Sequence, residues 1–319
     1  MKIIVLNNAL GQRHKDVIRE TADKVKAEIC FVESEDKIPL EFEDAEIIYG
    51  FGMKTAAKNK NLKWFCAPSA GIDFLLRPGI FANEDCLITN SAGAYGVSIA
   101  EHIIMVSLML MRQMSIIFKK SIMGEWSDRL PQKSLKDCRI TVLGTGDIGS
   151  SFARRAKAFE PKCIIGICRS GICDEPAFDS VMKPQSLDKV LPDTDLLVMC
   201  LPDTAETKGI LSRDRIGLLP EEAFVVNVGR GSAIDEDALA DSLDAGRLGG
   251  AALDVFVNEP LPKESRLWKT RNLIITPHVA GNLTLDYTAD KNVEMFCEDL
   301  LNYANELPLK HMIDKRRGY

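Results

Sequence analysis

A glycine-rich segment between an expected strand and an expected helix most constrains how this chain can fold. The apolar, β-branched run 139–143 is typical of a buried strand, and a helical pattern follows from about 147 to 159. Gly144, Gly146 and Gly149 have the spacing G-x-G-x-x-G. The first glycine allows a tight turn, the second lets the backbone approach a pyrophosphate, and the third lets the helix pack closely on the strand. The helix N-terminus would then hold the phosphates.

Three glycines alone also occur in methyltransferases and in plain tight turns. Because these three stand between a strand and a helix, a dinucleotide site is the favoured interpretation. We expect the cofactor to contact the residues of this turn, which are Gly144, Thr145, Gly146, Asp147, Ile148 and Gly149.

Length and composition exclude several other classes of protein. A chain of 319 residues predicts two domains, and 46% hydrophobic with 27% charged residues is ordinary for a globular protein. The net charge of −6 argues against nucleic acid as the main partner. We recognise no signal peptide, and the most apolar expected helix, 97–118, contains Glu101, His102 and Arg112, so we expect no membrane partner. Nine cysteines without a C-x-x-C pair predict no disulfide framework and no metal site in a cytoplasmic protein.

Strand-like and helix-like segments alternate in two series. The alternation predicts an α/β fold with a parallel sheet in each series. Expected strands of the first series are 2–6, 28–32, 46–49, 62–67 and 87–89, and those of the second are 139–143, 164–168, 196–201, 224–228, 251–255 and 273–276. Helices are expected at 97–118, 235–245 and 283–305.

Two loops of the first series are candidate substrate contacts. Residues 50–52 and 68–73 each follow an expected strand, and ligands of open α/β sheets bind beyond the carboxyl ends of the strands. Phe51 would supply an apolar wall beside the substrate. Turns without a binding role are the alternative reading of both loops.

Arg230, Glu259 and His278 each follow a different expected strand of the second series. A guanidinium binds a carboxylate in two places, and an imidazole exchanges a proton near neutral pH. Glu259 could accept a hydrogen bond from the second ring nitrogen of His278, which would fix the tautomer and favour the imidazolium. Singly, these residues could be a surface ion pair, a turn acid and a strand cap. Together with a dinucleotide site, they predict a hydride-transfer centre for a 2-oxo or 2-hydroxy acid.

Several short motifs follow one another along the chain: residues 98–102 (SIAEH), the glycine segment, 201–207 (LPDTAET), 226–231 (VNVGRG), 252–255 (ALDV), 259–260 (EP) and 276–278 (TPH). With this ordered set, the chain resembles the D-isomer-specific 2-hydroxyacid dehydrogenases over nearly its whole length. The resemblance implies a substrate-binding domain built from residues 1–93 and 284–319, a Rossmann NAD(P)-binding domain of residues 94–283, a cleft between them and a homodimer.

The resemblance also implies roles for individual residues. Arg230 would orient the substrate carboxylate and carbonyl, His278 would be the acid/base, and Glu259 would assist it. The backbone of Ala70 and Gly71 would lie near the substrate carboxylate. Further cofactor contacts are expected from Leu201, Pro202, Thr207, Val228, Gly229, Asp254, Ala280 and Gly281, with Asp254 near the nicotinamide.

The end of the second Rossmann strand indicates which cofactor is preferred. An acid that reads the ribose 2′-hydroxyl is expected about 20 residues beyond the glycines. Here Arg169 and Ser170 follow a cysteine, and the next carboxylate is Asp174. A neutral residue followed by Arg and Ser suits a 2′-phosphate, so we expect NADP(H) to be preferred. Arg169 could instead stack on adenine and accept either cofactor, which leaves NAD(H) open.

We therefore expect a reductase of a small 2-oxo acid such as glyoxylate, hydroxypyruvate or a short-chain analogue. Formate dehydrogenases of the family pair their histidine with glutamine, so Glu259 disfavours them. A short phosphoglycerate or erythronate-phosphate dehydrogenase stays open. In a different class, nucleotide-sensing corepressors share the fold and keep the triad. No low-complexity, proline-rich or basic tail is recognised, which favours the enzyme.

Overall fold

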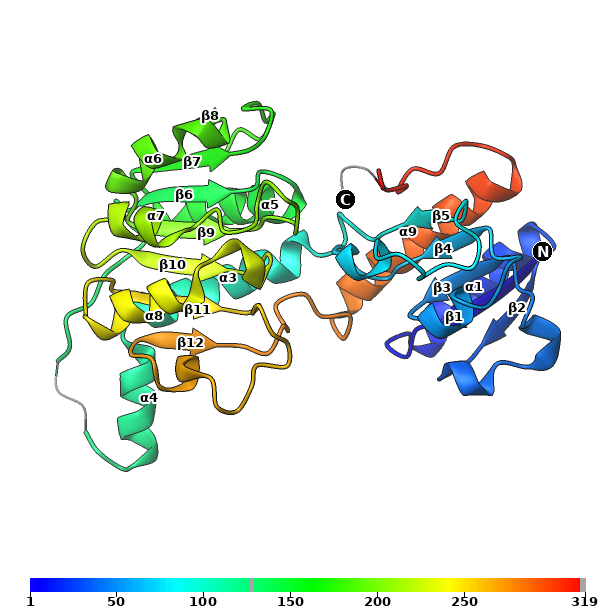
Figure 1. Ribbon diagram of the computed structural model, residues 1–319, viewed down its shortest axis with the longest axis horizontal. Coiled ribbons are helices and arrows are strands. Elements are labelled where there is room, and N and C mark those ends of the chain that lie inside the picture. The colour runs from blue at the N-terminus through cyan, green and yellow to red at the C-terminus, as the bar shows by residue number, and fades with distance from the viewer. Residues whose placement is uncertain (127–128, 316–319) are drawn as a thin grey trace. The chain divides into compact units, whose positions relative to one another are not determined.

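The computed structural model describes residues 1–126 and 129–315, and the chain divides into two compact units (Figure 1). The terminal unit comprises residues 1–95 and the described residues from 282 onward, and the central unit comprises residues 96–281. Residues 316–319, which we assign to the substrate-binding domain from the sequence, lie outside the described residues.

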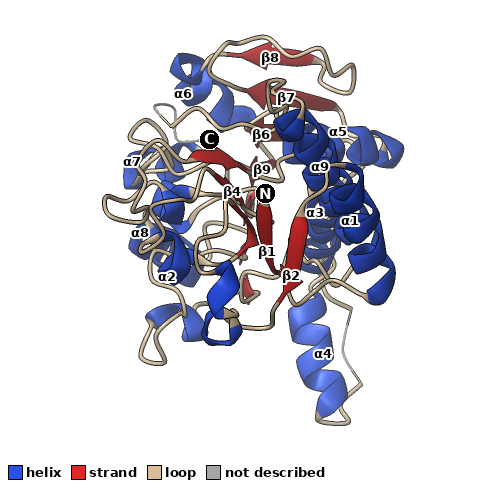
Figure 2. Cartoon of the chain, turned by 90° about the vertical axis from the view of Figure 1, so that its right-hand side faces the viewer, coloured by secondary structure: helices blue, strands red, loops and turns tan. Residues whose placement is uncertain are grey.

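The terminal unit is a parallel five-stranded sheet with apolar packing on both faces. In sheet order its strands are β2 (Glu28–Phe31), β1 (Lys2–Leu6), β3 (Ile47–Gly50), β4 (Trp64–Cys66) and β5 (Leu87–Thr89). Helices α1 (Gln12–Lys24) and α9 (Asp286–Ala304) pack together beside this sheet, and the short α2 (Met53–Ala56) follows β3 (Figure 2). One core cluster joins Ile18 of α1 and Phe296 of α9 to alternate strand residues.

The central unit is a parallel seven-stranded sheet covered on both faces. In sheet order its strands are β12 (Leu273–Ile275), β11 (Gly250–Leu253), β10 (Phe224–Asn227), β9 (Leu196–Met199), β6 (Arg139–Leu143), β7 (Cys163–Ile167) and β8 (Ser180–Met182). Its helices are α3 (Gly96–Met111), α4 (Met114–Ile122), α5 (Asp147–Ala156), α6 (Leu187–Val190), α7 (Arg213–Leu218) and α8 (Glu236–Asp244). Helix α3 packs against α5, β10 and β11, and residues of α6, α7 and α8 join a large apolar cluster with the strands.

The predicted fold class is confirmed, because both sheets are parallel and their strands alternate with helices. Strand β8 was not predicted from the sequence. Its three residues, Ser180–Met182, are only partly buried at the edge of the sheet, so they lack the apolar run of a central strand.

The prediction of one helix over 97–118 is wrong. Helix α3 ends at Met111, α4 begins at Met114, and their axes are bent by 74°. Gln113 adopts a left-handed conformation with φ +57°, which interrupts the helical backbone between them. The apolar pattern runs through both helices and does not mark this break, but burial separates them. Nine residues of α3 are buried in the core, whereas α4, which is described throughout, has no buried residue.

Within the described residues, no single helix is long and apolar enough to span a membrane. Among the residues that the structure describes, the bent pair α3 and α4 meets the length and composition of a span when its two helices are taken together.

Candidate active site

The turn from β6 into α5 has the shape of a dinucleotide cradle. Gly144 has φ +95°, which favours glycine. A Cβ atom on Gly149 would lie 1.9 Å from the carbonyl oxygen of Gly144, so only glycine allows α5 to start this close to β6. A Cβ atom on Gly146 would meet nothing within 4 Å, so the second glycine borders open space. Helix α5 begins at Asp147 without a side-chain cap, and the backbone donors of its first turn suit a phosphate.

Two side chains hold the middle of this turn, one from α5 and one from the segment after β7. The hydroxyl of Ser150 donates to the carbonyl oxygen of Thr145 at 2.9 Å, and the thiol of Cys173 donates to the same oxygen at 3.5 Å. The residues that follow β7 therefore contact the glycine turn directly.

The segment that follows β7 contains the residues expected at the cofactor ribose. The sulfur of Cys168 lies 3.4 Å from the hydroxyl oxygen of Ser170, which also donates to the carbonyl oxygen of Ile172 at 3.0 Å. Partial burial would raise the pKa of the Cys168 thiol, but hydrogen bonds with Ser170, Thr145 and backbone groups outweigh it and lower that pKa from 9.0. Hydrogen bonds of the Glu206 carboxyl with its own backbone and with Thr204 lower its pKa, and the Arg169 charge adds to this effect.

Glu259 and His278 are in direct contact. The Nδ1 atom of His278 lies 2.7 Å from Oε2 of Glu259, and Oε1 of Glu259 accepts from the backbone N–H of Phe256 at 2.8 Å. Both carboxylate oxygens are thus held in place. The side chains of His278 and Glu259 stay 50% and 34% exposed, so a small molecule can reach the imidazole.

Arg230 lies on the adjacent loop at the same edge of the sheet. Strands β10, β11 and β12 are parallel neighbours, and the three loops that carry Arg230, Glu259 and His278 leave their carboxyl ends. A Cβ atom on Gly231 would lie 2.0 Å from the carbonyl carbon of Phe256, so the Arg230 loop packs on the loop that holds Glu259. The Arg230 Nη1 donates to the carbonyl oxygen of Gly229 at 2.8 Å.

Asp254 organises the turn that carries His278. It is only 2% exposed, and its carboxylate accepts from the hydroxyl of Thr276 at 2.6 Å and from the backbone N–H groups of Val279 and Ala280, each at 2.9 Å. The backbone N–H of His278 donates to the carbonyl oxygen of Asp254 at 2.8 Å. His278 has φ +54°, a conformation that a non-glycine residue adopts only when its surroundings hold it.

The other expected cofactor contacts lie along the same edge. The Thr207 hydroxyl donates to the carbonyl oxygen of Pro202 at 2.7 Å and folds the loop after β9. The Val228 N–H donates to the carbonyl oxygen of Met199 at 3.1 Å, and a Cβ atom on Gly229 would lie 2.6 Å from the carbonyl oxygen of Leu201.

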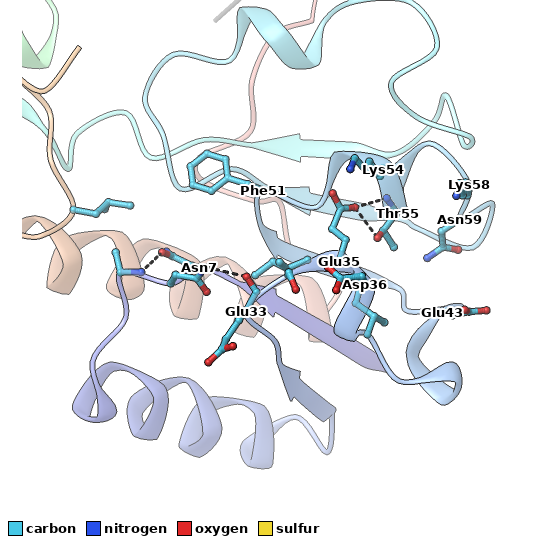
Figure 3. Close-up of a pocket in the computed structure, with 16 residues that line it drawn as sticks. Asn7, Glu33, Glu35, Asp36, Glu43, Phe51, Lys54, Thr55, Lys58 and Asn59 are labelled. Atoms are coloured by element: carbon cyan, nitrogen blue, oxygen red, sulfur yellow. Dashed lines mark hydrogen bonds between the residues drawn. The ribbon is translucent and has the colours of Figure 1, made fainter. Parts of the chain in front are cut away.

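The expected substrate contacts Phe51, Ala70 and Gly71 belong to the terminal unit. Phe51 follows β3 and borders a cavity of about 950 Å³ (Figure 3). This cavity is lined mainly by polar and charged side chains, among them Glu35, which accepts from the Thr55 hydroxyl at 2.8 Å. The carbonyl oxygens of Ala70 and Gly71 accept from the side chains of Asn90 and Ser69, at 2.8 and 2.9 Å.

Sequence reasoning missed several residues that hold the site together. Asn227 donates to the carbonyl oxygen of Arg230 at 2.9 Å and accepts from the N–H of Gly229 at 3.0 Å. Glu236 accepts from the N–H of Val257 at 2.7 Å, and burial raises its pKa. Asn227 and Thr276 stand inside recognised motifs, and this position could have indicated their role in the site. No sequence feature indicates the role of Glu236, because it lies in the first turn of a helix, where acids are common.

Comparison with known proteins places this arrangement in a family. The model of the "D-isomer specific 2-hydroxyacid dehydrogenase, NAD binding domain" matches residues 104–280. Glyoxylate/hydroxypyruvate reductase A of Salmonella newport is 32% identical over 192 residues, which cover 60% of this chain and 59% of that protein. D-3-phosphoglycerate dehydrogenase of Archaeoglobus fulgidus is 28% identical over 306 residues, which cover 95% of this chain and 54% of that protein. The chain thus spans less than two thirds of the length of these two relatives.

Solved structures resemble the whole chain. A D-isomer specific 2-hydroxyacid dehydrogenase family protein from Aeromonas salmonicida is 31% identical with a TM-score of 0.87, over 98% of this chain and 99% of that chain. An NADPH-dependent glyoxylate/hydroxypyruvate reductase from Sinorhizobium meliloti, in complex with NADP and sulfate, is 26% identical with a TM-score of 0.82, over 100% of this chain and 99% of that chain. This chain therefore belongs to the D-isomer-specific 2-hydroxyacid dehydrogenases, a family of NAD(P)-dependent oxidoreductases.

Proposed function

We propose that this protein uses NADPH to reduce a small 2-oxo acid to the D-2-hydroxy acid. The observation that carries the proposal is the 2.7 Å contact between His278 and Glu259 at the sheet edge that also bears the glycine turn. In this proposal the central unit is the cofactor domain and the terminal unit, with Phe51, Ala70 and Gly71, is the substrate domain.

In the proposed reaction, His278, Glu259 and Arg230 have separate roles. Bound NADPH would supply the hydride for the carbonyl carbon. Glu259 occupies Nδ1 of His278, so the proton held at Nε2 is the one given to the carbonyl oxygen. Glu259 keeps the ring oriented through its contact with Nδ1. Arg230 binds the substrate carboxylate through its planar fork and so orients the carbonyl between the hydride and the proton.

The preference for NADP(H) rests on the segment after β7. Arg169 and Ser170 stand where an acid would read a ribose hydroxyl, and a guanidinium with a hydroxyl suits a 2′-phosphate. The Sinorhizobium meliloti reductase, whose structure contains NADP, supports the same choice.

The test is a panel of 2-oxo acids assayed with NADPH and with NADH by the loss of absorbance of the reduced cofactor. The panel contains glyoxylate, hydroxypyruvate, pyruvate and 3-phosphohydroxypyruvate. We expect turnover of glyoxylate or hydroxypyruvate with NADPH and formation of the D-isomer where the product is chiral. Cofactor binding without turnover of any panel acid would contradict the proposal and favour a nucleotide-sensing protein.

A second candidate is the oxidation of a phosphorylated 2-hydroxy acid. The match to the Archaeoglobus fulgidus D-3-phosphoglycerate dehydrogenase covers 95% of this chain, which supports this alternative. Turnover of 3-phosphohydroxypyruvate in preference to the unphosphorylated acids would select it.

We also propose that the protein forms a homodimer through α4 and residues 123–126. Large apolar side chains are exposed along this segment, including Phe118, Ile122, Met123 and Trp126. Ile122 is 86% and Trp126 is 98% exposed, and α4 projects from the body of the central unit (Figure 1). Several large exposed apolar side chains on one short segment are typical of a protein interface, and a second copy of the chain is the partner that the family resemblance implies.

A further inference from the structure

We propose that His102 of α3 is a positioning residue for the proposed reaction, acting through Thr276 and Asp254 on the turn that carries His278. The inference rests on the proposed function, and the juxtaposition behind it lies wholly within the central unit. The Nε2 atom of His102 lies 3.3 Å from the hydroxyl oxygen of Thr276, and that oxygen lies 2.6 Å from Oδ1 of Asp254.

The chemistry of the groups sets the direction of this chain of hydrogen bonds. An ionised carboxylate only accepts, so the single proton of the Thr276 hydroxyl is donated to Asp254. The hydroxyl oxygen must then accept from His102, which requires a proton on Nε2 of that ring. Burial lowers the pKa of His102, with a smaller opposing effect of the Asp254 charge, which favours the neutral ring. The contact with the Thr276 oxygen then places the single ring proton on Nε2.

This chain of hydrogen bonds ends at the backbone of the turn that carries His278, the proposed acid/base. Oδ1 of Asp254 receives the Thr276 hydroxyl and the N–H of Val279, and Oδ2 receives the N–H of Ala280. These bonds bracket His278, whose backbone has φ +54°. His102 thus fixes the orientation of the Asp254 carboxylate, and Asp254 fixes the turn, so the imidazole of His278 is held where Glu259 meets it.

Two variants separate hydrogen bonding from packing at His102. His102→Gln keeps an N–H donor at the end of a side chain of similar length, whereas His102→Met fills the space and cannot donate. We expect kcat to fall about 3- to 10-fold in His102→Met, as for the loss of one hydrogen bond. His102→Gln should stay within about 2-fold of the wild type, with the KM for NADPH and the thermal midpoint preserved in both variants.

A second pair of variants tests the route through Thr276. Thr276→Val removes the hydroxyl with little change of shape, and it should lower kcat about as much as His102→Met. The double variant should then lose no more than either single one, because both interrupt the same chain. Additive losses would show that His102 and Thr276 act separately and would overturn the proposal.

Hydrogen exchange provides a readout that does not need turnover. The backbone amides of Val279 and Ala280 should exchange at least about 3-fold faster in His102→Met and Thr276→Val than in the wild type, and at the wild-type rate in His102→Gln. Unchanged exchange in His102→Met would overturn the positioning role, as would equal losses of kcat in the Gln and Met variants. Faster exchange in a protein that reduces no 2-oxo acid would instead support the positioning role and count against the proposed function alone.

Discussion

Glu259 and His278 are 19 residues apart in the sequence, yet Oε2 of the first lies 2.7 Å from Nδ1 of the second. The contact depends on two neighbouring parallel strands, β11 and β12, whose carboxyl ends lie side by side. It orients the ring so that one nitrogen faces the carboxylate and Nε2 is left for the substrate. A carboxylate that holds a histidine in this way is the usual partner of a histidine acting as a general acid.

Replacement of His278 by Gln is expected to lower kcat by about 10²- to 10⁴-fold, because general acid catalysis contributes that much to the rate. The NADPH dissociation constant should change little, since the proposed phosphate contacts lie at the start of α5. Stopped-flow measurement of NADPH oxidation and fluorescence titration of the cofactor check the two parts. Replacement of His14, which bonds to Asp290 in the terminal unit, is the matched control. Retained turnover in the His278 variant would remove it from the mechanism.

Replacement of Arg169 by Ala is expected to lower kcat/KM with NADPH by about 10- to 100-fold and to leave that with NADH nearly unchanged. The reason is the loss of a charge-assisted bond to the 2′-phosphate, which is worth roughly 1.5–3 kcal/mol. Arg213→Ala removes an exposed arginine that pairs with Asp241 and serves as the control. An equal loss with both cofactors would indicate that Arg169 stacks on the adenine instead.

The glycine turn and the residues that follow the strands could be predicted because both depend on local sequence. Gly144, Gly146 and Gly149 identify a strand–turn–helix unit within ten residues, and parallel topology brings the loops with Glu259 and His278 to one edge. The break at Gln113 could not be predicted, because the apolar pattern crosses it unchanged. The contact of His102 with Thr276 joins residues 174 apart, and no local pattern encodes which polar atom a half-buried histidine meets.

The thiol of Cys168 is expected to react with iodoacetamide faster than the other cysteines of the central unit and more slowly when NADPH is bound. Hydrogen bonds overcome the effect of burial and lower its pKa from 9.0, so more thiolate is present below that pH. Burial raises the pKa of Cys200 to about 12, which makes it the internal control. Mass spectrometry of the peptides with Cys168 and Cys200 at pH 7.5 gives both rates. Labelling that NADPH does not slow would place the cofactor away from the segment after β7.

A charge on the exposed surface of α4 is expected to dissociate the proposed homodimer. Ile122→Glu places a carboxylate where an apolar contact would be buried, and an unpaired buried charge is strongly unfavourable. Sedimentation velocity should show a dimer for the wild type and a monomer for the variant. Leu40, which is 81% exposed in the terminal unit, provides the matched control as Leu40→Glu, expected to stay dimeric. A monomeric wild type would refute the proposed interface.

Acid is expected to destabilise the wild-type protein more than the His102→Gln variant. Burial lowers the pKa of His102 below its ordinary value of 6.5, so below about pH 6.5 the unfolded chain takes up a proton that the folded protein resists. The free energy of unfolding therefore falls as the pH falls through this range, and above it His102 contributes no pH dependence. Glutamine does not titrate, so the difference in urea midpoint between pH 7.5 and pH 5.5 should be smaller in the variant, while every other titrating group is the same in both proteins. Equal differences in urea midpoint would mean that His102 is as easily protonated in the folded protein as in the unfolded chain. Burial would then not be the reason that its ring is a neutral N–H donor near neutral pH.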